Sequence, residues 1–330
     1  MTRSPVLDEV ADWLRRRSWT AADRPLPDLL AAKRASGSTV SVVLPALDEE
    51  ATVGEIVTAI RRDLMEDVPL VDELVVIDSG STDRTGQAAA AAGARVVHRD
   101  AILPHLPVIP GKGEVLWRSL LVTTGDIVCF IDADLREFDS TFVSGIVGPL
   151  LTEPDVAFVK AMYDRPLDTD TADGTVSIPA GGGRVTELVA RPLLNLHWPL
   201  LAGFVQPLGG EYAARRALLE RLPFPTGYGV ELGLLVDALD LAGLDALAQV
   251  DVGVRHHRHQ DALALGRMAA TIHLTALDRL ARTDRLKAGD DLVRLRLTQF
   301  TRTAAGFTPT TVDIPTVERP PIVTLPERDV

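Results

Sequence analysis

Residues 127–134 constrain the fold of this chain most, because five apolar residues lead directly into Asp-Ala-Asp. A short apolar run that follows the break Gly125-Asp126 is typical of a strand buried on both faces of a parallel sheet. Such sheets bind ligands outside the carboxyl ends of their strands. Asp132 and Asp134 stand at that end, and alternation along the strand lets both point the same way. The motif predicts a metal-bridged diphosphate site, with an acidic turn as the competing interpretation.

The surrounding segments alternate between strand and helix patterns. Strands are expected at residues 39–44, 73–77, 95–98 and 127–131. The helix after the first strand begins near Thr52, which forms a capping box pattern with Glu55. This order predicts an α/β fold with a Rossmann-like half. The motif Gly-x-Gly-x-x-Gly is absent after the first strand, which argues against a bound NAD or FAD.

Polar loops follow other expected strands in the same half. Residues 46–50 read Ala-Leu-Asp-Glu-Glu, and residues 78–83 read Asp-Ser-Gly-Ser-Thr-Asp. Residues 110–113 read Pro-Gly-Lys-Gly and precede a helix expected at residues 115–122. They are not a Walker A loop, but the glycines permit close backbone approach and Lys112 supplies a cation. The alternative is an ordinary turn with a solvated lysine.

The second half of the chain contains further candidate sites. Residues 181–184, Gly-Gly-Gly-Arg, precede an amphipathic helix and predict a site for phosphate or carboxylate, with a flexible loop as the alternative. Glu231 lies in the first turn of a helix expected to reach residue 241, where a carboxylate also stabilises the helix dipole. Residues 255–259, Arg-His-His-Arg-His, offer one metal-binding imidazole or form a solvated basic loop.

The remaining segments suggest how the chain is divided. An N-terminal arm at residues 1–37 is expected to pack on the body through Trp13 and Trp19. Residues 38–160 form the expected nucleotide-binding half, residues 161–299 the acceptor-binding half and residues 300–330 an extended tail. Within these parts, strands are expected at residues 156–163 and 248–254, a loop at residues 169–180, and a helix at residues 263–282.

Charge and composition exclude several classes of function. The net charge of −12 argues against a broad basic surface for nucleic acid or an anionic membrane. The single cysteine, Cys129, cannot form an internal disulfide, which fits a reducing, cytoplasmic compartment. No secretory signal is expected at the N-terminus. Residues 192–208 are apolar but contain Asn195, His197 and Gln206, and are too short for a membrane span.

Together these motifs predict a reaction at a diphosphate. Carboxylates at strand ends, a lysine at a helix start and a glycine-rich anion loop suit phosphorylated ligands with a divalent ion. Charge compensation of the departing group is then the main catalytic effect.

Four of these motifs also carry a family resemblance. Residues 43–50, 78–83, 132–134 and 183–192 resemble those of the glucosyl-3-phosphoglycerate synthases, which are retaining GT-A glycosyltransferases of family 81. The resemblance covers residues 39–270, and its most specific part is the glycine-rich run with residues 227–231. It implies a GT-A fold in which a Rossmann-like nucleotide-binding half is fused to an acceptor-binding half. It also implies a homodimer that transfers glucose from UDP-glucose to the 2-hydroxyl of 3-phosphoglycerate, with retention of configuration and with Mg²⁺ or Mn²⁺.

The resemblance implies a role for each matching residue. The uridine is held by Pro45, Ala46, Leu47, Glu49 and Ser79. The rest of the nucleotide sugar is contacted by Lys112, Asp132, Ala133, Asp134, Tyr228 and Glu231. The metal ligands are Asp134 and His257. The acceptor is bound by Gly183, Arg184, Thr186, Arg255 and His259. The expected catalytic residues are Glu231, Asp134 and Lys112. For Glu231, the resemblance therefore implies a role in addition to stabilising the helix dipole.

Three alternatives stay open. The mannosyl-3-phosphoglycerate synthases, which use GDP-mannose, are close in the same family, and residues 201–208 and 318–322 look more like that branch. Residues 45–50 look more like the glucosyl branch. A metal-dependent nucleotidyltransferase also uses strand-end carboxylates, but releases pyrophosphate. A non-catalytic nucleotide-sugar-binding protein is the third alternative. Two positions depart from the family: Ala133 stands where relatives have Ser, and His259 where they often have Asn.

Overall fold

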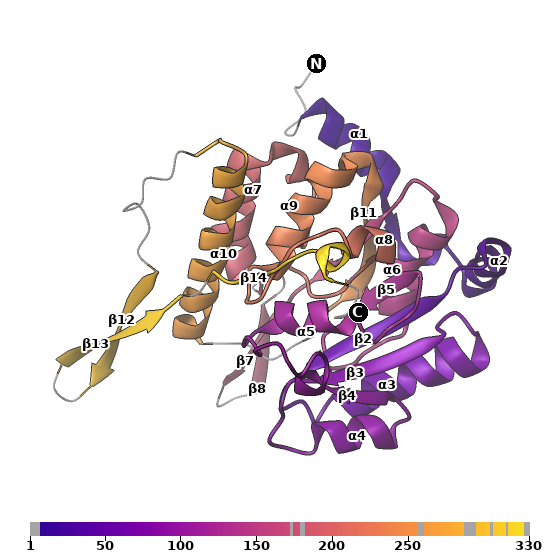
Figure 1. The fold of residues 1–330 in the computed structure, drawn as a ribbon, viewed down its shortest axis with the longest axis horizontal. Helices are drawn as coiled ribbons and strands as arrows, with labels where there is room; N and C mark the ends of the chain where they lie inside the picture. The colour runs from indigo at the N-terminus through magenta and orange to yellow at the C-terminus, as the bar shows by residue number, and fades with distance from the viewer. Residues whose placement is uncertain are drawn as a thin grey trace.

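The computed structural model describes residues 7–171, 174–178, 182–256, 261–286, 295–303, 306–314 and 316–326. Its centre is one eight-stranded sheet (Figure 1). In spatial order the strands are β1 (Ser18–Thr20), β11 (Leu247–Val254), β6 (Phe158–Asp164), β9 (Tyr212–Arg215), β5 (Ile127–Phe130), β2 (Val40–Ala46), β3 (Glu73–Asp78) and β4 (Arg95–His98). The strands predicted from the apolar runs are confirmed, while β1 and β9 were not predicted.

The sheet is parallel except at β9, which runs antiparallel to both β5 and β6. Because β9 reverses the direction twice, β5 and β6 run the same way. The carboxyl ends of β2, β3, β5, β6 and β11 therefore lie at one edge, as the first strand-end motif predicts. Strands from both expected halves of the chain share this sheet.

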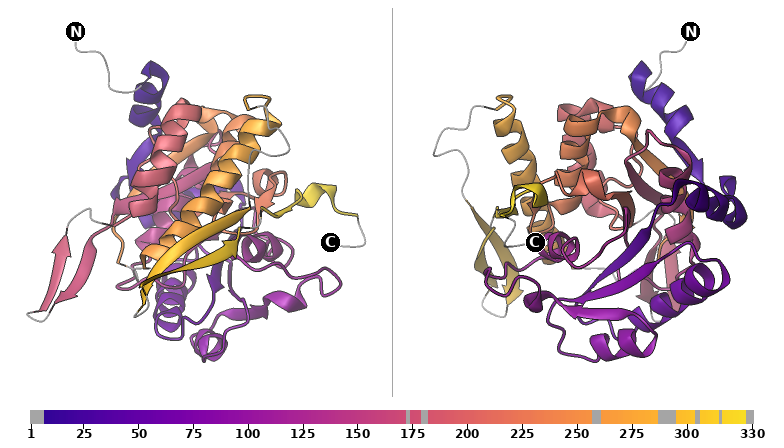
Figure 2. Two further views of the ribbon diagram at one scale, coloured as in Figure 1. Left: turned by 90° about the vertical axis from the view of Figure 1, so that its left-hand side faces the viewer. Right: turned by 45° about the vertical axis from the view of Figure 1, so that its right-hand side comes forward.

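Helices cover both faces of the sheet and make an α/β sandwich of three layers (Figures 1 and 2). One face carries α2 (Leu26–Ser36), α3 (Val53–Arg61), α4 (Thr85–Ala91) and α6 (Thr141–Thr152). The other carries α1 (Asp8–Arg17), α5 (Lys112–Ser119), α7 (Arg191–His197), α8 (Arg216–Leu219), α9 (Val230–Ala242) and α10 (Ala262–Arg282). Short 3₁₀ or π segments are η1 (Ala21–Asp23), η2 (Arg62–Asp67), η3 (Arg99–Ala101), η4 (Thr186–Ala190), η5 (Pro199–Leu201), η6 (Leu244–Ala246) and η7 (Ile322–Thr324).

Side-chain alternation along β5 divides the core in two. Val128 and Phe130 pack in the cluster under α5 and α9, while Ile127 and Cys129 pack in the cluster under α3 and α6. Burial on both faces explains why this strand is apolar at every position rather than at every second one. The α/β fold class that the sequence predicts is thus confirmed.

Two hairpins extend from the body. The first, β7 (Leu167–Thr171) with β8 (Gly174–Ile178), projects clearly in Figure 2 (left). The predicted loop is therefore wrong at residues 169–171 and 174–178, since the threonines and valine of this stretch favour strands more than its polarity opposes them. The second is β12 (Arg296–Thr303) with β13 (Gly306–Asp313). Near the C-terminus, β14 (Glu318–Arg319) pairs with β10 (Phe224–Pro225).

The N-terminal arm packs on the body, as its tryptophans predict. Trp13 is fully buried, and its indole Nε1 donates a hydrogen bond of 2.7 Å to the carbonyl of Leu247. The arm also adds β1 to the edge of the sheet beside β11. Among the described helices, none combines the length and apolar character needed to cross a membrane.

Candidate active site

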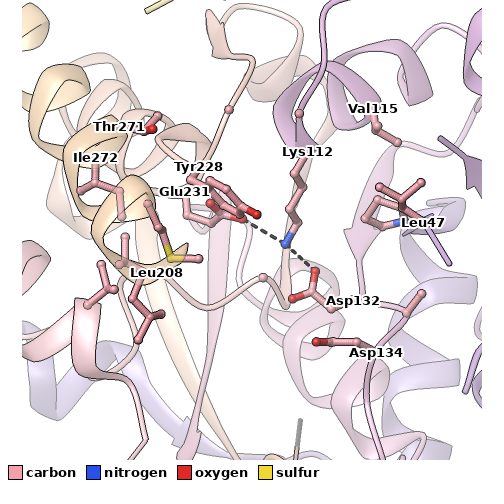
Figure 3. Close-up of a pocket in the computed structure, with 18 of the residues that line it drawn as sticks. Leu47, Lys112, Val115, Asp132, Asp134, Leu208, Tyr228, Glu231, Thr271 and Ile272 are labelled. Atoms are coloured by element: carbon pink, nitrogen blue, oxygen red, sulfur yellow. Dashed lines mark hydrogen bonds and ion pairs between the residues drawn. The ribbon is translucent and has the colours of Figure 1, made fainter. Parts of the chain in front are cut away.

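A cavity of about 680 Å³ opens at the carboxyl edge of the sheet (Figure 3). Strand ends, the starts of α5 and α9, and one side of α10 supply its walls. Of the predicted site residues it is lined by Pro45, Ala46, Leu47, Glu49, Ser79, Lys112, Asp132, Ala133, Asp134, Gly183, Arg184, Thr186, Tyr228, Glu231 and Arg255. His257 and His259 lie outside the described residues. One cavity thus joins motifs that are far apart in the sequence.

The loop after β5 is supported by Thr52, a residue that the sequence predicts to cap a helix. Thr52 precedes α3 but makes no side-chain cap, so the predicted capping box with Glu55 is wrong. Its hydroxyl instead donates a 2.5 Å hydrogen bond to the carbonyl of Ala133. The hydroxyl has this partner because the loops after β2 and β5 lie side by side at the sheet edge. The bond fixes the backbone between the two aspartates.

Lys112 and Arg255 hold the carboxylates of the cavity in one network. The Lys112 ammonium pairs with Asp132 and lies 3.0 Å from Glu231 Oε1 (Figure 3). Arg255 Nη2 lies 2.9 Å from Asp132 Oδ2 and 3.3 Å from Asp134 Oδ1. Asp132 therefore sits between two cations, and the aspartates do point the same way.

The two aspartates differ in their electrostatic surroundings. Burial raises the pKa of Asp132, but Lys112 and Arg255 outweigh it and hold that pKa at about 2. For Asp134 burial prevails, with further repulsion from Asp132, and the pKa is raised despite Arg255. Asp134 is thus the carboxylate whose charge has more to gain from an added cation.

A layer of buried polar groups supports this network from below. Glu211 accepts from Arg255 Nε at 2.8 Å and from the Tyr163 hydroxyl at 2.7 Å. Lys160 donates to the carbonyl of Gly209 at 2.7 Å, and its ammonium lies 4.7 Å from the centroid of the Tyr212 ring. Burial lowers the pKa of Lys160 to about 8. Sequence reasoning missed Glu211 and Lys160. For Lys160 the available signal is a charged residue that interrupts an apolar strand pattern, whereas Glu211 precedes a strand that was not predicted.

Further lining residues carried no motif. Among them are Arg99, Tyr163, Arg165, Leu208, Leu265, Met268, Thr271 and Ile272. The last four lie on α10, and Leu265, Met268 and Ile272 form an apolar wall with Leu208. An amphipathic sequence pattern shows that one face of a helix is apolar, but it does not distinguish packing against the core from contact with a ligand.

The glycines of the Gly-Lys-Gly segment allow two parts of the chain itself to pack closely together. α5 begins at Lys112, three residues earlier than predicted, after Gly111 with φ +131°. A side chain at Gly113 would collide with the Pro225 carbonyl, and Glu114 N donates to Thr226 O at 3.3 Å. The close approach that the glycines permit is therefore to residues 225–227, and it brings the start of α5 against the start of α9.

The glycine-rich loop meets the cavity where a helical segment begins. Gly183 has φ +72°, a conformation that favours glycine, and Glu187 N donates to Gly183 O at 3.0 Å. Gly182 N is bound to the Arg165 carbonyl at 2.9 Å. Arg184 and Thr186 then line the cavity from the first helical turn. A backbone of this shape, with an arginine beside it, suits an anionic ligand.

The donor set fits a divalent cation. Within the described ranges, no group of three His, Cys, Asp or Glu side chains is placed to hold a metal ion. Asp134 carries a buried charge that a cation would stabilise, and the predicted partner ligand, His257, lies beyond these ranges. A carboxylate with an imidazole and diphosphate oxygens is a normal environment for Mg²⁺ or Mn²⁺.

Comparisons with known proteins agree with the geometry. A family model described as glycosyl transferase family 2 matches residues 41–175. The glucosyl-3-phosphoglycerate synthase of Mycolicibacterium smegmatis is 50% identical over 316 residues, which cover 96% of this chain and 99% of that protein. The synthase of Mycobacterium tuberculosis, crystallised with Mn²⁺, UDP and phosphoglyceric acid, superposes with a TM-score of 0.78 at 48% identity over 91% of this chain and 95% of that one.

A mannosyl-3-phosphoglycerate synthase has a similar backbone. The structure of the enzyme from Rubrobacter xylanophilus superposes with a TM-score of 0.87 at 41% identity, over 96% of this chain and 98% of that one. The predicted GT-A fold is thereby confirmed. Since half of the residues are identical to a curated relative over almost the whole length, the chain belongs to the glucosyl-3-phosphoglycerate synthase family of GT-A glycosyltransferases.

Proposed function

We propose that this protein is a retaining glycosyltransferase that moves glucose from UDP-glucose to the 2-hydroxyl of 3-phosphoglycerate. The observation that carries the proposal is the single cavity of about 680 Å³, which joins the strand-end carboxylates to the Gly183–Arg184–Thr186 loop. A volume of this order accommodates a nucleotide sugar and a small acceptor together. Curated relatives that match nearly the whole chain are named glucosyl-3-phosphoglycerate synthases, which supports glucosyl transfer to 3-phosphoglycerate.

The donor is assigned to the strand ends. Pro45, Ala46, Leu47, Glu49 and Ser79 surround the uridine, at the end of β2 and just after β3. Asp132 binds the ribose or orients the loop, and the backbone at Ala133 contacts the nucleotide. Asp134 and His257 would hold Mg²⁺ or Mn²⁺, which supplies charge compensation for the diphosphate when bound.

The sugar and the acceptor meet between Lys112 and the glycine-rich loop. Glu231 and Tyr228 contact the glucose, and the Lys112 ammonium beside Glu231 is placed to stabilise negative charge on the departing phosphate. Gly183, Arg184 and Thr186 bind the phosphoglycerate, together with Arg255 and His259. The carboxylate and phosphate of the acceptor explain why an acidic chain concentrates arginine here.

The reaction retains the configuration of the sugar. The bond from glucose C1 to the phosphate oxygen breaks, and a bond from C1 to the acceptor 2-oxygen forms on the same face. The proton of the acceptor hydroxyl passes to the departing phosphate oxygen, which leaves UDP and the α-glucoside. This chain's residues hold the two substrates in reach and exclude water from the oxocarbenium-like centre.

A donor-by-acceptor matrix tests the function. Purified protein with Mg²⁺ is offered UDP-glucose or GDP-mannose, each with 3-phosphoglycerate, glycerol 3-phosphate or no acceptor. We expect UDP release with UDP-glucose and 3-phosphoglycerate, and an α-anomeric proton signal in the product. Faster release of GDP from GDP-mannose would replace the glucosyl by the mannosyl activity. Pyrophosphate release in a separate reaction with UTP and glucose 1-phosphate would indicate a nucleotidyltransferase, and UDP binding without turnover a binding protein.

Organisation and location complete the proposal. We assign residues 38–160 to the donor and residues 161–299 to the acceptor, with the arm and the tail as additions to this body. The protein is expected to be a homodimer, as is typical of its family. A cytoplasmic location is supported by the lone, buried Cys129, which suits a reducing compartment.

A further inference from the structure

The segment of residues 316–325, here called the C-terminal clamp, lies against three elements that line the cavity. β14 lies between α10 and α5 in Figure 1. Arg319 makes two hydrogen bonds of 2.6 Å to the carboxylate of Glu114 on α5. The same carboxylate accepts from Arg118 Nε at 2.7 Å, and the side chains of Glu114 and Arg118 are fully buried. The clamp is thus bound to α5 by a sealed ion network.

Aromatic contacts extend this attachment. The Arg319 guanidinium lies 5.2 Å from the centroid of the Trp117 ring, and the Trp117 indole donates to the Pro320 carbonyl at 2.8 Å. A bidentate guanidinium stacked on an indole has little orientational freedom. The clamp therefore fixes the rotation of α5 as well as its position.

The clamp is also bound to the helices on the other side of the cavity. Glu318 pairs with Arg279 and Arg282 on α10. Arg279 in turn lies 2.6 Å from the carboxylate of Asp237 on α9. Next to Glu318, the Val317 carbonyl accepts from Thr226 N at 3.0 Å and from Thr226 Oγ1 at 2.9 Å. This threonine stands just before Gly227 and Tyr228.

Two of the helices that the clamp connects present an ion-paired residue to the cavity. Lys112 is two residues from Glu114 on α5, and Glu231 lies in the first turn of α9. The 3.0 Å ion pair between Lys112 and Glu231 crosses from one helix to the other. An apolar contact would stabilise the fold as well as a buried ion pair does, so the bidentate geometry favours a role in alignment.

We propose that Arg319 and Glu318 are positioning residues, which set α5 against α9 so that Lys112 meets the donor phosphate beside Glu231. The proposal rests on the glucosyl transfer proposed above. It assigns a role to the tail, which supplies no cavity-lining residue among those the structure describes. Misplacement of a catalytic group by about 1 Å can cost about 100-fold in rate.

The test compares Arg319→Ala, Arg319→Lys and Glu318→Gln with a control, Asp313→Asn. The control breaks the exposed 3.2 Å pair with Arg296 on the β12–β13 hairpin, whose described residues do not line the cavity. We expect Arg319→Ala to lower kcat at least about tenfold while KM for 3-phosphoglycerate changes less than about twofold. Arg319→Lys restores part of kcat because it keeps the charge without the fork. Glu318→Gln has an intermediate effect, and the control equals the parent.

A second measurement separates the possible failures. Thermal unfolding shows which variants fold. If Arg319→Ala does not fold, the rates of Arg319→Lys and Glu318→Gln test the positioning role instead. Folded clamp variants with kcat within about twofold of the parent would overturn the proposal, and so would equal losses in kcat and in acceptor affinity. UDP affinity with Mg²⁺, measured by calorimetry, should fall in the same order as kcat. If the parent does not transfer glucose, the proposed function fails, and the UDP affinities alone decide on the clamp.

Discussion

Two ion networks on the same helix differ in what they leave open to a ligand. At the start of α5, Lys112 bridges Asp132 and Glu231, whose side chains are 20% and 8% exposed at the cavity. Two residues further on, Glu114 is fully buried and closed by Arg118 and Arg319. Charged groups that face the cavity can exchange a protein partner for a ligand. The buried groups around Glu114 cannot, so they can only fix the positions of the elements that they join. Mutations in the two networks should therefore fail in different ways.

The largest effect on activity is expected from a mutation in the ion network that faces the cavity. Asp134→Ala removes the carboxylate proposed to hold the metal, and kcat should fall by at least about 100-fold. The matched control is Asp126→Asn at the other end of β5, where the carboxylate accepts from Thr39 N at 2.9 Å and from Thr39 Oγ1 at 2.8 Å. That variant should keep kcat within about twofold of the parent. Steady-state rates of UDP release measure both, and equal losses would refute a special role for Asp134.

A smaller and different effect is expected at the acceptor loop. Arg184→Ala should raise KM for 3-phosphoglycerate about tenfold, because a charged hydrogen bond to an anion is lost. KM for UDP-glucose should change less than about twofold. The measurement is a pair of saturation curves. An increase of KM for UDP-glucose alone would show that Arg184 contacts the donor and not the acceptor.

The support of the Asp-Ala-Asp loop offers a third comparison. Thr52→Val removes the hydrogen bond to Ala133 but keeps the shape, and kcat should fall about three- to tenfold, as expected for about 1 kcal/mol. Thr58→Val within α3 removes an exposed bond to Gly54, and neither residue lines the cavity. Its kcat should equal that of the parent. Identical rates for the two variants would show that the loop needs no such support.

The smallest effect concerns stability rather than turnover. Burial lowers the pKa of Lys160 to about 8, from 10.5 for a free lysine. Between these values the unfolded chain binds more protons than the folded one, so the contribution of Lys160 to stability rises with pH. Relative to Lys160→Met, the parent should gain about 1 kcal/mol in free energy of unfolding between about pH 7 and pH 9. Urea unfolding at both pH values checks this, and a gain of the opposite sign would contradict it.

Much of the fold and of the cavity could be predicted from local patterns. The apolar runs predict β2, β3, β5 and β6, and the polar residues after them fall in one cavity because parallel strands end at one edge. The expected roles of those residues stay predictions. Local patterns depend on neighbouring residues only, and that is why they succeed here.

What could not be predicted depends on pairs that are distant in sequence. The four-residue strand β9 has no distinctive pattern, and its place between β5 and β6 decides which residues lie under the cavity. The bond from Arg255 to Glu211 depends on that register. Likewise, nothing around Glu114 indicates that Arg319 will be its partner.

The contact between Gly113 and Pro225 has a consequence for how this protein can evolve. Two backbones that touch leave no space for any side chain, so position 113 should accept only glycine in a library of random substitutions. Lys112 beside it should accept many residues for folding but few for turnover. Selection for folding and selection for activity would thus act separately on adjacent positions, and Gly111 and Gly113 would have to change together with residues 225–227 or stay as they are.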